Sequence, residues 1–254
     1  MQIIKELIQS LSDKEVVDVR IGLHWTAVVV QEDGVQKCGL SSTLDSPHDH
    51  EKSGPDVPAA GSLTELNGVA LAEFALDEKK VLRSVGMAAI NALIPSTPEL
   101  WVEDNAEEMI ANHGAGKKVA LIGHFPFIRS LRERVGELTI LELKPRPGDL
   151  HADQAERIIP DVQVLAVTSM TFPNHTLEHV MSFVQPGTVV IMLGPTTPLT
   201  PQLFDYGIDI ISGSVVEDIP SVLKMVSQGA GFRQIHNAGV RLVNMMRPQM
   251  VAQA

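Results

Sequence analysis

The sequence predicts an α/β protein with two domains, residues 1–95 and 96–254. The chain has 254 residues, 44% of them hydrophobic, which exceeds the usual size of one domain and is enough for a core in each half. Residues 95–98 read Pro-Ser-Thr-Pro and cannot continue a helix, so we place the boundary there. Beyond them, short apolar runs alternate with helical segments, which is typical of a parallel sheet with helices on both faces.

The first domain is predicted to be α+β, with one helix, an antiparallel meander and then further helices. Residues 2–12 carry apolar side chains at helical spacing, and the segments that follow are rich in β-branched residues. Asp33-Gly34 supplies a turn into the third strand because both residues tolerate positive φ. Ser62 and Glu65 fit a capping box that starts the helical part. The predicted strands are 16–21, 26–31 and 35–40, the later helices 63–75 and 78–93, and the long loop 43–60. Asn67-Gly68 is expected to interrupt the first of these two helices.

The second domain is predicted to be a Rossmann-like, doubly wound, mainly parallel sheet. Its strands are short and apolar on both faces, and helical segments separate them, so we expect neighbouring strands to run parallel. The predicted strands are 118–123, 138–143, 163–169, 188–193 and 208–212, and the predicted helices are 104–112, 127–134, 151–158, 176–184, 200–205 and 217–227. Ligands of such sheets bind outside the carboxyl ends of the strands, which makes the residues after each strand the candidates for a site.

The composition argues against several classes of function. A formal charge of −11 and a pI near 5.2 repel nucleic-acid backbones, and no Lys/Arg cluster reverses that field locally. Cys38 is the only cysteine, which excludes an intrachain disulfide and a cysteine-based zinc cage. No apolar run approaches the roughly 20 residues that cross a bilayer. We therefore expect a soluble cytoplasmic protein without a nucleic-acid or membrane partner.

Met245 and Met246, near the end of the chain, are interpreted as core residues or as part of a face of a homo-oligomer.

The segment Gly123-His-Phe-Pro-Phe127 is the first candidate site, because an apolar strand ends there in glycine and a helix follows. The first N–H groups of a helix are unpaired and carry partial positive charge, so they can hold a phosphate or a carboxylate. Gly123, Phe125 and Pro126 are therefore predicted to contact a ligand. The segment lacks the later glycines of G-x-G-x-x-G, and Phe125 and Pro126 stand where a pyrophosphate needs bare backbone, which disfavours a standard NAD site.

His124 and Glu142 are the candidate chemical groups of this sheet edge. An imidazole titrates near neutral pH, so His124 could act as a general base or polarise a carbonyl group, and the alternative is a histidine that caps nearby backbone groups. Glu142 ends the second strand, where nucleotide and S-adenosylmethionine folds often place an acid that binds ribose hydroxyls. The competing interpretations of Glu142 are a solvated strand end and an ion pair with Arg146.

Polar residues also follow the third and fourth strands of the second domain. N-capping of the next helix explains one of Asn174 and Thr176 without a ligand, but two such residues in one turn favour binding. The predicted ligand contacts after these two strands are Ser169, Asn174, Thr176, Gly194, Pro195 and Thr196.

The pattern His48-Asp-His-Glu51 offers imidazole and carboxylate groups, which are the ligands that borderline divalent cations accept. Alternating residues of a polar loop are not fixed in a chelating geometry, so a charged surface loop is the preferred interpretation and no metal site is predicted. The alternative is a non-catalytic metal or metallophore carrier that uses His48 and His50.

Seven motifs together resemble the two-domain bacterial and archaeal family called "putative heavy-metal chelation", once a domain of unknown function. They are Gly22-Leu-His-Trp-Thr26, Ala60-Gly-Ser-Leu63, Gly86-Met-Ala-Ala-Ile-Asn-Ala92, Gly123-His-Phe-Pro-Phe127, Pro147-Gly-Asp149, Asn174-x-Thr176 and Gly194-Pro-x-x-Pro198. The resemblance covers nearly the whole chain. It implies an enolase N-terminal-like domain followed by a Rossmann-like domain with partial likeness to methyltransferases, and one cleft lined by both domains.

The resemblance also implies a function, namely condensation or hydrolysis in the synthesis of pterin-, flavin- or siderophore-type chelators, with a link to anaerobic cobalamin synthesis. The leading hypothesis is accordingly an enzyme that binds a small anionic or heterocyclic molecule, similar to a pterin, a nucleotide or S-adenosylmethionine, in an interdomain cleft. His124 is the predicted proton-transfer residue, and Asn91 and His24 are the predicted contributions of the first domain. The remaining alternative is a nucleotide or S-adenosylmethionine sensor without chemistry.

Overall fold

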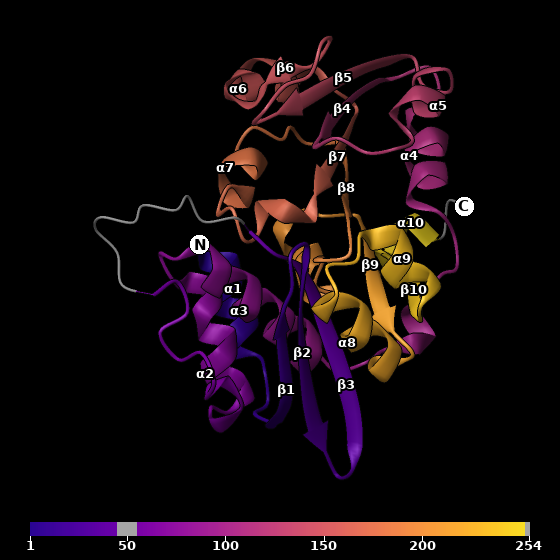
Figure 1. Cartoon of the computed structure of the whole chain (residues 1–254). Coiled ribbons are helices and arrows are strands. Elements are labelled where there is room, and N and C mark those ends of the chain that lie inside the picture. Colours follow the sequence, from indigo (N-terminus) through magenta and orange to yellow (C-terminus); the bar gives the residue numbers. More distant parts are fainter. Residues whose placement is uncertain (45–54, 252–254) are drawn as a thin grey trace.

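The protein is described here by a computed structural model that covers residues 1–44 and 55–251 (Figure 1). Its elements confirm the predicted α/β class, with a three-stranded sheet in the first part of the chain and a seven-stranded sheet in the second. The helices and strands before the boundary are α1 (Gln2–Gln9), β1 (Glu15–Ile21), β2 (Trp25–Glu32), β3 (Val35–Ser42), α2 (Gly68–Glu73) and α3 (Lys80–Leu93). Within the described residues, every helix is too short or too polar to cross a membrane.

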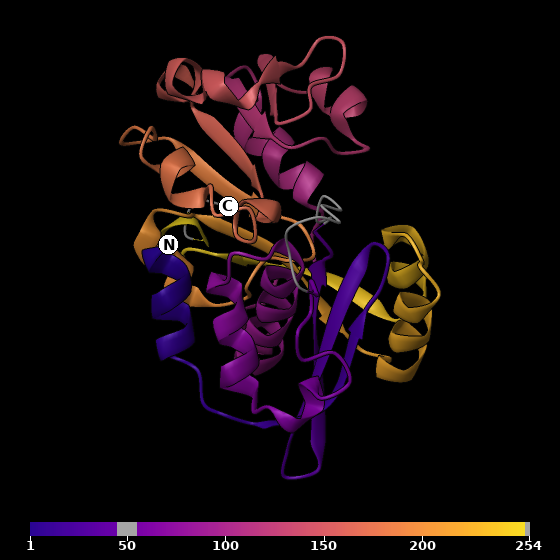
Figure 2. The same cartoon turned by 60° about the vertical axis from the view of Figure 1, so that its left-hand side comes forward.

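The first part of the chain forms the predicted antiparallel meander, in the order β1-β2-β3. Asp33 and Gly34 both adopt positive φ at the turn between β2 and β3, as expected for this residue pair. Helix α3 covers one face of the small sheet, and α8 (Ile219–Ser227), from the end of the chain, packs on the other face (Figure 2). This α+β arrangement is what the resemblance implied for an enolase N-terminal-like domain.

The predicted helix 63–75 is interrupted. Its residues form a 3-10 turn at Leu63–Glu65, the short helix α2, and a second 3-10 turn, η2, at Phe74–Leu76. The physical cause of the break is Asn67, whose side chain accepts a hydrogen bond of 2.8 Å from the backbone N–H of Ala70 and so starts a new helix.

The second part of the chain is the predicted doubly wound sheet, with the strand order β10-β9-β8-β7-β4-β5-β6. Counted from β4, the parallel strands follow the Rossmann order 3-2-1-4-5-6, and β10 pairs antiparallel with β9 at the edge. The remaining elements are α4 (Ala106–Gly114), β4 (Lys118–Ile122), α5 (Ile128–Arg132), β5 (Glu137–Glu142), β6 (Leu150–His151), α6 (Ala155–Ile158), β7 (Val164–Thr168), α7 (Leu177–Met181), β8 (Val189–Leu193), β9 (Ile210–Val216), α9 (Phe232–Asn237), β10 (Val240–Met246) and α10 (Pro248–Val251).

Several of these elements differ from the prediction. The sequence did not indicate β6, α9 or β10, and residues 201–206 form a 3-10 helix, η7 (Pro201–Tyr206). Strand β10 carries Asn244 inside an apolar run, which hides the strand pattern. In the structure Asn244 is buried and its side chain donates to the backbone oxygens of Val102 and Asp104, so the tertiary contacts stabilise a strand that its own sequence marks weakly.

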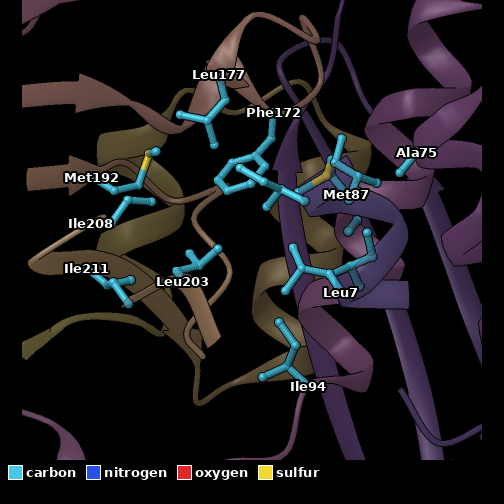
Figure 3. Packing of buried hydrophobic residues seen from close by; sticks show 14 of the residues in the cluster. Leu7, Ala75, Met87, Ile94, Phe172, Leu177, Met192, Leu203, Ile208 and Ile211 are labelled. Atoms are coloured by element: carbon cyan, nitrogen blue, oxygen red, sulfur yellow. The ribbon is translucent and has the colours of Figure 1, made fainter. Parts of the chain in front are cut away.

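One hydrophobic core joins the two parts of the chain (Figure 3). Leu7 and Met87 of the first part face Phe172 and Leu203 of the second, and all four side chains are at most 1% exposed. Helices α4 and α5 cover the opposite face of the large sheet with a separate core. The position of the first part against the large sheet is therefore set by shared apolar packing.

Candidate functional site

The large sheet forms a pocket of about 540 Å³ at the carboxyl ends of β4, β5 and β7. Strands β4 and β7 are neighbours in space, and the chain winds away from them in opposite directions, so this is the topological switch point at which Rossmann-like folds bind ligands. We call it the carboxyl-edge pocket. The predicted site residues that line it are Gly123, His124, Phe125, Glu142, Asn174 and Thr176.

The described residues that line the carboxyl-edge pocket all come from the second part of the chain, between Ile122 and Val180. The expectation of a cleft lined by both domains is therefore not met at this place within the ranges 1–44 and 55–251. The first part of the chain instead contacts the loops of the pocket from behind.

Gly123 makes the turn after β4, where the backbone passes close to Thr168 at the end of β7. Its φ is +102°, and a Cβ atom at this position would lie 3.0 Å from Cβ of Thr168, so only glycine fits without strain. The predicted anion cradle is weaker than expected, because α5 is five residues long and begins only at Ile128. Pro126 is exposed and does not line this pocket.

His124 is held by a carboxylate. Its Nδ1 lies 3.3 Å from Oδ2 of Asp149, whose side chain is only 6% exposed and also accepts a 3.0 Å hydrogen bond from the backbone N–H of Arg146. In the tautomer that carries its proton on Nδ1, the imidazole donates to this carboxylate, and Nε2 then makes no hydrogen bond within the described residues. The backbone cap considered as the alternative is therefore not formed among these residues. Sequence reasoning missed Asp149, although the Pro147-Gly-Asp149 turn was recognised as a motif.

Glu142 keeps acceptor capacity at the pocket. Its Oε2 accepts from the backbone N–H of Leu143 at 2.9 Å, and within the described residues the carboxylate forms no ion pair. The ion pair with Arg146 is therefore not formed. Since a carboxylate has about four lone-pair sites, most of them remain available to hydroxyl groups of a ligand.

Asn174 and Thr176 lie on one wall of the carboxyl-edge pocket. Thr176 is the N-cap residue of α7, but its side chain makes no capping hydrogen bond, so the N-cap explanation does not hold for it. His175, between them, has a φ of +60° and its Nε2 lies 2.7 Å from the backbone oxygen of Ala75. Arg83 of α3 also donates to the backbone oxygen of Pro173 at 3.4 Å. The first part of the chain thus holds this wall in place.

The loop after β8 does not line the carboxyl-edge pocket and instead hydrogen-bonds to the first part of the chain, while Ser169 lies directly after β7. Ser169 is 2% exposed, and its Oγ fills the space beside Gly194, where a Cβ atom would lie 2.4 Å away. Thr196 is fully buried and its Oγ1 accepts a 3.0 Å hydrogen bond from the backbone N–H of Ser42. Gly194 and Pro195 line a different hollow, of about 760 Å³, beside the start of α4 and α9. The structure therefore assigns Ser169 and Thr196 to packing between elements.

The two predicted residues of the first domain lie away from the carboxyl-edge pocket. Nδ2 of Asn91 donates to the backbone oxygens of Leu40 at 2.9 Å and Thr196 at 3.0 Å, which links the two parts of the chain. His24 is exposed at the turn between β1 and β2. Neither side chain can reach His124 as a partner in proton transfer, because neither lines its pocket.

The part of the chain that the structure describes brings together no group of three His, Cys, Asp or Glu side chains suited to a metal ion. His48, His50 and Glu51 lie outside the described residues, so the metal-carrier alternative stays a prediction.

Residues 4–94 and 105–245 match two family profiles, and both carry the description "putative heavy-metal chelation". The second match alone covers more than half of the chain. The protein belongs to this heavy-metal chelation family. The expected resemblance is thereby confirmed, and the two matched segments correspond to the meander part and the Rossmann-like part described above.

Two solved structures share this architecture over almost the whole chain. A crystal structure from Desulfitobacterium hafniense, a protein of unknown function, is 25% identical with a TM-score of 0.83 and covers 97% of this chain and 98% of that one. Another, from Pyrococcus horikoshii, is 20% identical with a TM-score of 0.80 and equal coverage, and supports the fold. An uncharacterised protein of Methanocaldococcus jannaschii is 26% identical over 84% of this chain and 85% of its own length.

Proposed function

We propose that the protein is an enzyme that binds a small heterocyclic molecule with hydroxyl groups, similar to a nucleoside or a pterin, in the carboxyl-edge pocket. The observation that carries the proposal is the meeting of three kinds of group at the switch point. These are the imidazole of His124 oriented by Asp149, the carboxylate of Glu142, and the polar pair Asn174 and Thr176.

Each wall of the pocket suits a different part of such a ligand. Glu142 is the last residue of β5, where its carboxylate can accept hydrogen bonds from a pair of hydroxyl groups. Phe125, Leu143 and Val180 offer apolar surface for a planar ring. The side chains of Asn174 and Thr176 can hydrogen-bond to the edge of that ring and fix its orientation.

His124 supplies the chemistry in this proposal. With Nδ1–H bound to Asp149, Nε2 is the atom that accepts a proton from water or from a ligand hydroxyl or amine. The carboxylate of Asp149 then stabilises the imidazolium that results. Proton removal of this kind serves both hydrolysis and condensation. A protein that makes or modifies an organic metal chelator in this way also fits the description of the family.

The binding part of the proposal is tested by calorimetry with S-adenosylmethionine, GTP and a reduced pterin. We expect one of these compounds to bind, and Glu142→Gln to weaken its binding by about tenfold or more, since a charged acceptor contributes about 1.5–3 kcal/mol to a hydrogen bond. Glu133→Gln, at an exposed acid outside the pocket, is the matched control and should bind normally. Binding that Glu142→Gln leaves unchanged, or no binding by any of the three compounds, contradicts the proposal.

The catalytic part is tested by mass spectrometry of the bound compound after incubation. His124→Asn should abolish conversion while the compound still binds. Asp149→Asn should lower kcat more than it raises KM, because Asp149 orients His124 without lining the pocket. A sensor, by contrast, would bind the compound and release it unchanged in every variant.

A further inference from the structure

A second cavity, of about 310 Å³, lies between the two parts of the chain. We call it the interdomain cavity. It is lined by the hairpin of β2 and β3, the end of α3, Trp101 and the outer part of β9, and it shares no residue with the carboxyl-edge pocket. Nothing in the proposed function uses it, so its lining groups need a separate explanation.

The titratable groups that line the interdomain cavity leave one positive charge without a partner. They are Lys14, Glu32, Lys37 and Cys38. Lys14 pairs with Glu32 at 2.8 Å between Nζ and Oε2. Lys37 forms no ion pair with any described residue, and its Nζ donates only to the backbone oxygen of Ile94. Cys38 stays neutral, because burial raises the pKa of its thiol to about 12.

The environment of Lys37 disfavours its charged form. Burial, together with the nearby charge of Lys14, lowers the pKa of the Lys37 ammonium to about 8. A buried charge without a counter-charge is costly, whereas an anion that enters the cavity would restore the ordinary protonation of the lysine. The charge pattern therefore favours an anionic occupant.

Two neutral groups of the cavity lining also lack a partner. Oδ1 of Asn91 and the indole Nε1–H of Trp101 are buried, and within the described residues neither makes a hydrogen bond. Buried polar groups in proteins are nearly always paired. Nδ2 of Asn91 donates to two backbone oxygens, which identifies the other amide atom as Oδ1, a hydrogen-bond acceptor that faces the cavity. The occupant should thus offer a donor to Asn91 and acceptors to Trp101 and Lys37.

We propose that the interdomain cavity is a second ligand site, which binds a small hydroxycarboxylate anion. Its carboxylate accepts from Lys37 and Trp101, and its hydroxyl group donates to Asn91. Because Lys37 and Asn91 belong to the first part of the chain and Trp101 to the second, the ligand bridges the two parts.

The test is calorimetry with DL-malate, and with succinate as the matched compound that lacks the hydroxyl group. We expect malate to bind at least about tenfold more tightly than succinate, because succinate leaves Asn91 unpaired. Lys37→Met should weaken malate binding by at least about tenfold. Lys224→Met, at an exposed lysine of α8, should bind malate as the unaltered protein does.

The pH dependence gives a second readout of the same site. Between pH 7 and pH 9 the affinity for malate should fall by about tenfold, because the free Lys37 loses its proton across this range. Lys37→Met should remove that dependence. Absence of malate binding, equal binding of succinate, or binding that Lys37→Met leaves intact each overturns the proposal. His124→Asn should bind malate normally, so the two sites can fail independently.

Discussion

The carboxyl-edge pocket and the interdomain cavity are built in different ways. The pocket gathers loops that follow neighbouring parallel strands, and its described lining comes from the second part of the chain. The cavity is lined by side chains from both parts, and within the described residues it holds an ammonium group that forms no ion pair and two neutral groups that form no hydrogen bond. The carboxyl-edge pocket therefore follows from the topology of a single sheet, whereas the interdomain cavity exists only because the two parts of the chain pack together.

The first part of the chain nevertheless shapes the carboxyl-edge pocket. The backbone oxygen of Ala75 in η2 holds His175, and Arg83 holds Pro173, so the wall with Asn174 and Thr176 is fixed from behind. The same part of the chain provides Lys37 and Asn91 to the interdomain cavity. A variant that moves α3 and η2 should therefore disturb the pocket without touching its lining.

Gly86→Ala should have the largest effect of the variants considered. A Cβ atom on Gly86 would lie 1.9 Å from the backbone N of Ala75, so α3 and η2 must separate. We expect the free energy of unfolding to fall by about 3 kcal/mol, and the ligand of the carboxyl-edge pocket to bind more weakly, because Ala75 no longer positions His175. Chemical denaturation and calorimetry measure the two effects.

Gly231→Ala is the matched control for Gly86→Ala, since its Cβ atom would meet nothing closer than 3.9 Å. It should lower the free energy of unfolding by about 1 kcal/mol at most, because Gly231 is the N-cap residue of α9 and alanine is a poorer N-cap, and it should leave the binding unchanged. If Gly86→Ala destabilises the protein but leaves binding intact, the first part of the chain does not support the pocket wall.

Lys37→Met should stabilise the protein at neutral pH. The pKa of Lys37 is about 8 in the folded protein and 10.5 as the ordinary value, so the unfolded chain binds more protons between these limits. The free energy of unfolding therefore increases with pH between about 8 and 10.5. Below about pH 8, the buried charge of Lys37 lowers the free energy of unfolding by a constant amount. We expect a gain of about 2 kcal/mol at pH 7 for the variant.

The free energy of unfolding of Lys37→Met has to be measured against pH and compared with that of the unaltered protein. The thiol pKa of Cys38 is raised from 9.0 to about 12, so Cys38 contributes the opposite trend, with stability lost as pH rises above 9.0. Both proteins contain Cys38, and the difference between their denaturation profiles isolates Lys37. A difference that stays constant from pH 7 to pH 10.5 would show that Lys37 is not desolvated in the cavity.

His175→Ala should have a smaller effect than Gly86→Ala and Lys37→Met. It should alter the wall of the carboxyl-edge pocket and leave the interdomain cavity unchanged. The variant loses the contact with Ala75 and places alanine at a φ of +60°, which together cost about 1–2 kcal/mol. We expect a few-fold weaker binding in the carboxyl-edge pocket and no change of malate binding in the interdomain cavity. His175→Asn tolerates the backbone angle and separates the backbone effect from the lost contact.

Much of the carboxyl-edge pocket could be predicted because a parallel sheet brings the ends of its strands to one edge. The places of Gly123, Glu142, Asn174 and Thr176 at or after the ends of strands predict that they line one pocket, as they do. Asp149 was missed as the partner of His124, since its loop lies between two strands and the sequence does not tell which side chain its carboxylate meets.

Local sequence patterns were enough to predict the α/β class, the meander, five strands of the large sheet and the residues at their carboxyl ends, because these depend on periodicity and on turn residues that act over a few positions. Long-range packing fixed the order of the strands, the edge strands β6 and β10, the link between Thr196 and Asn91, and the meeting of Lys37 and Trp101 around one cavity. Contacts of this kind connect residues far apart in the chain, and they follow from how two packed surfaces fit each other, which local patterns do not encode.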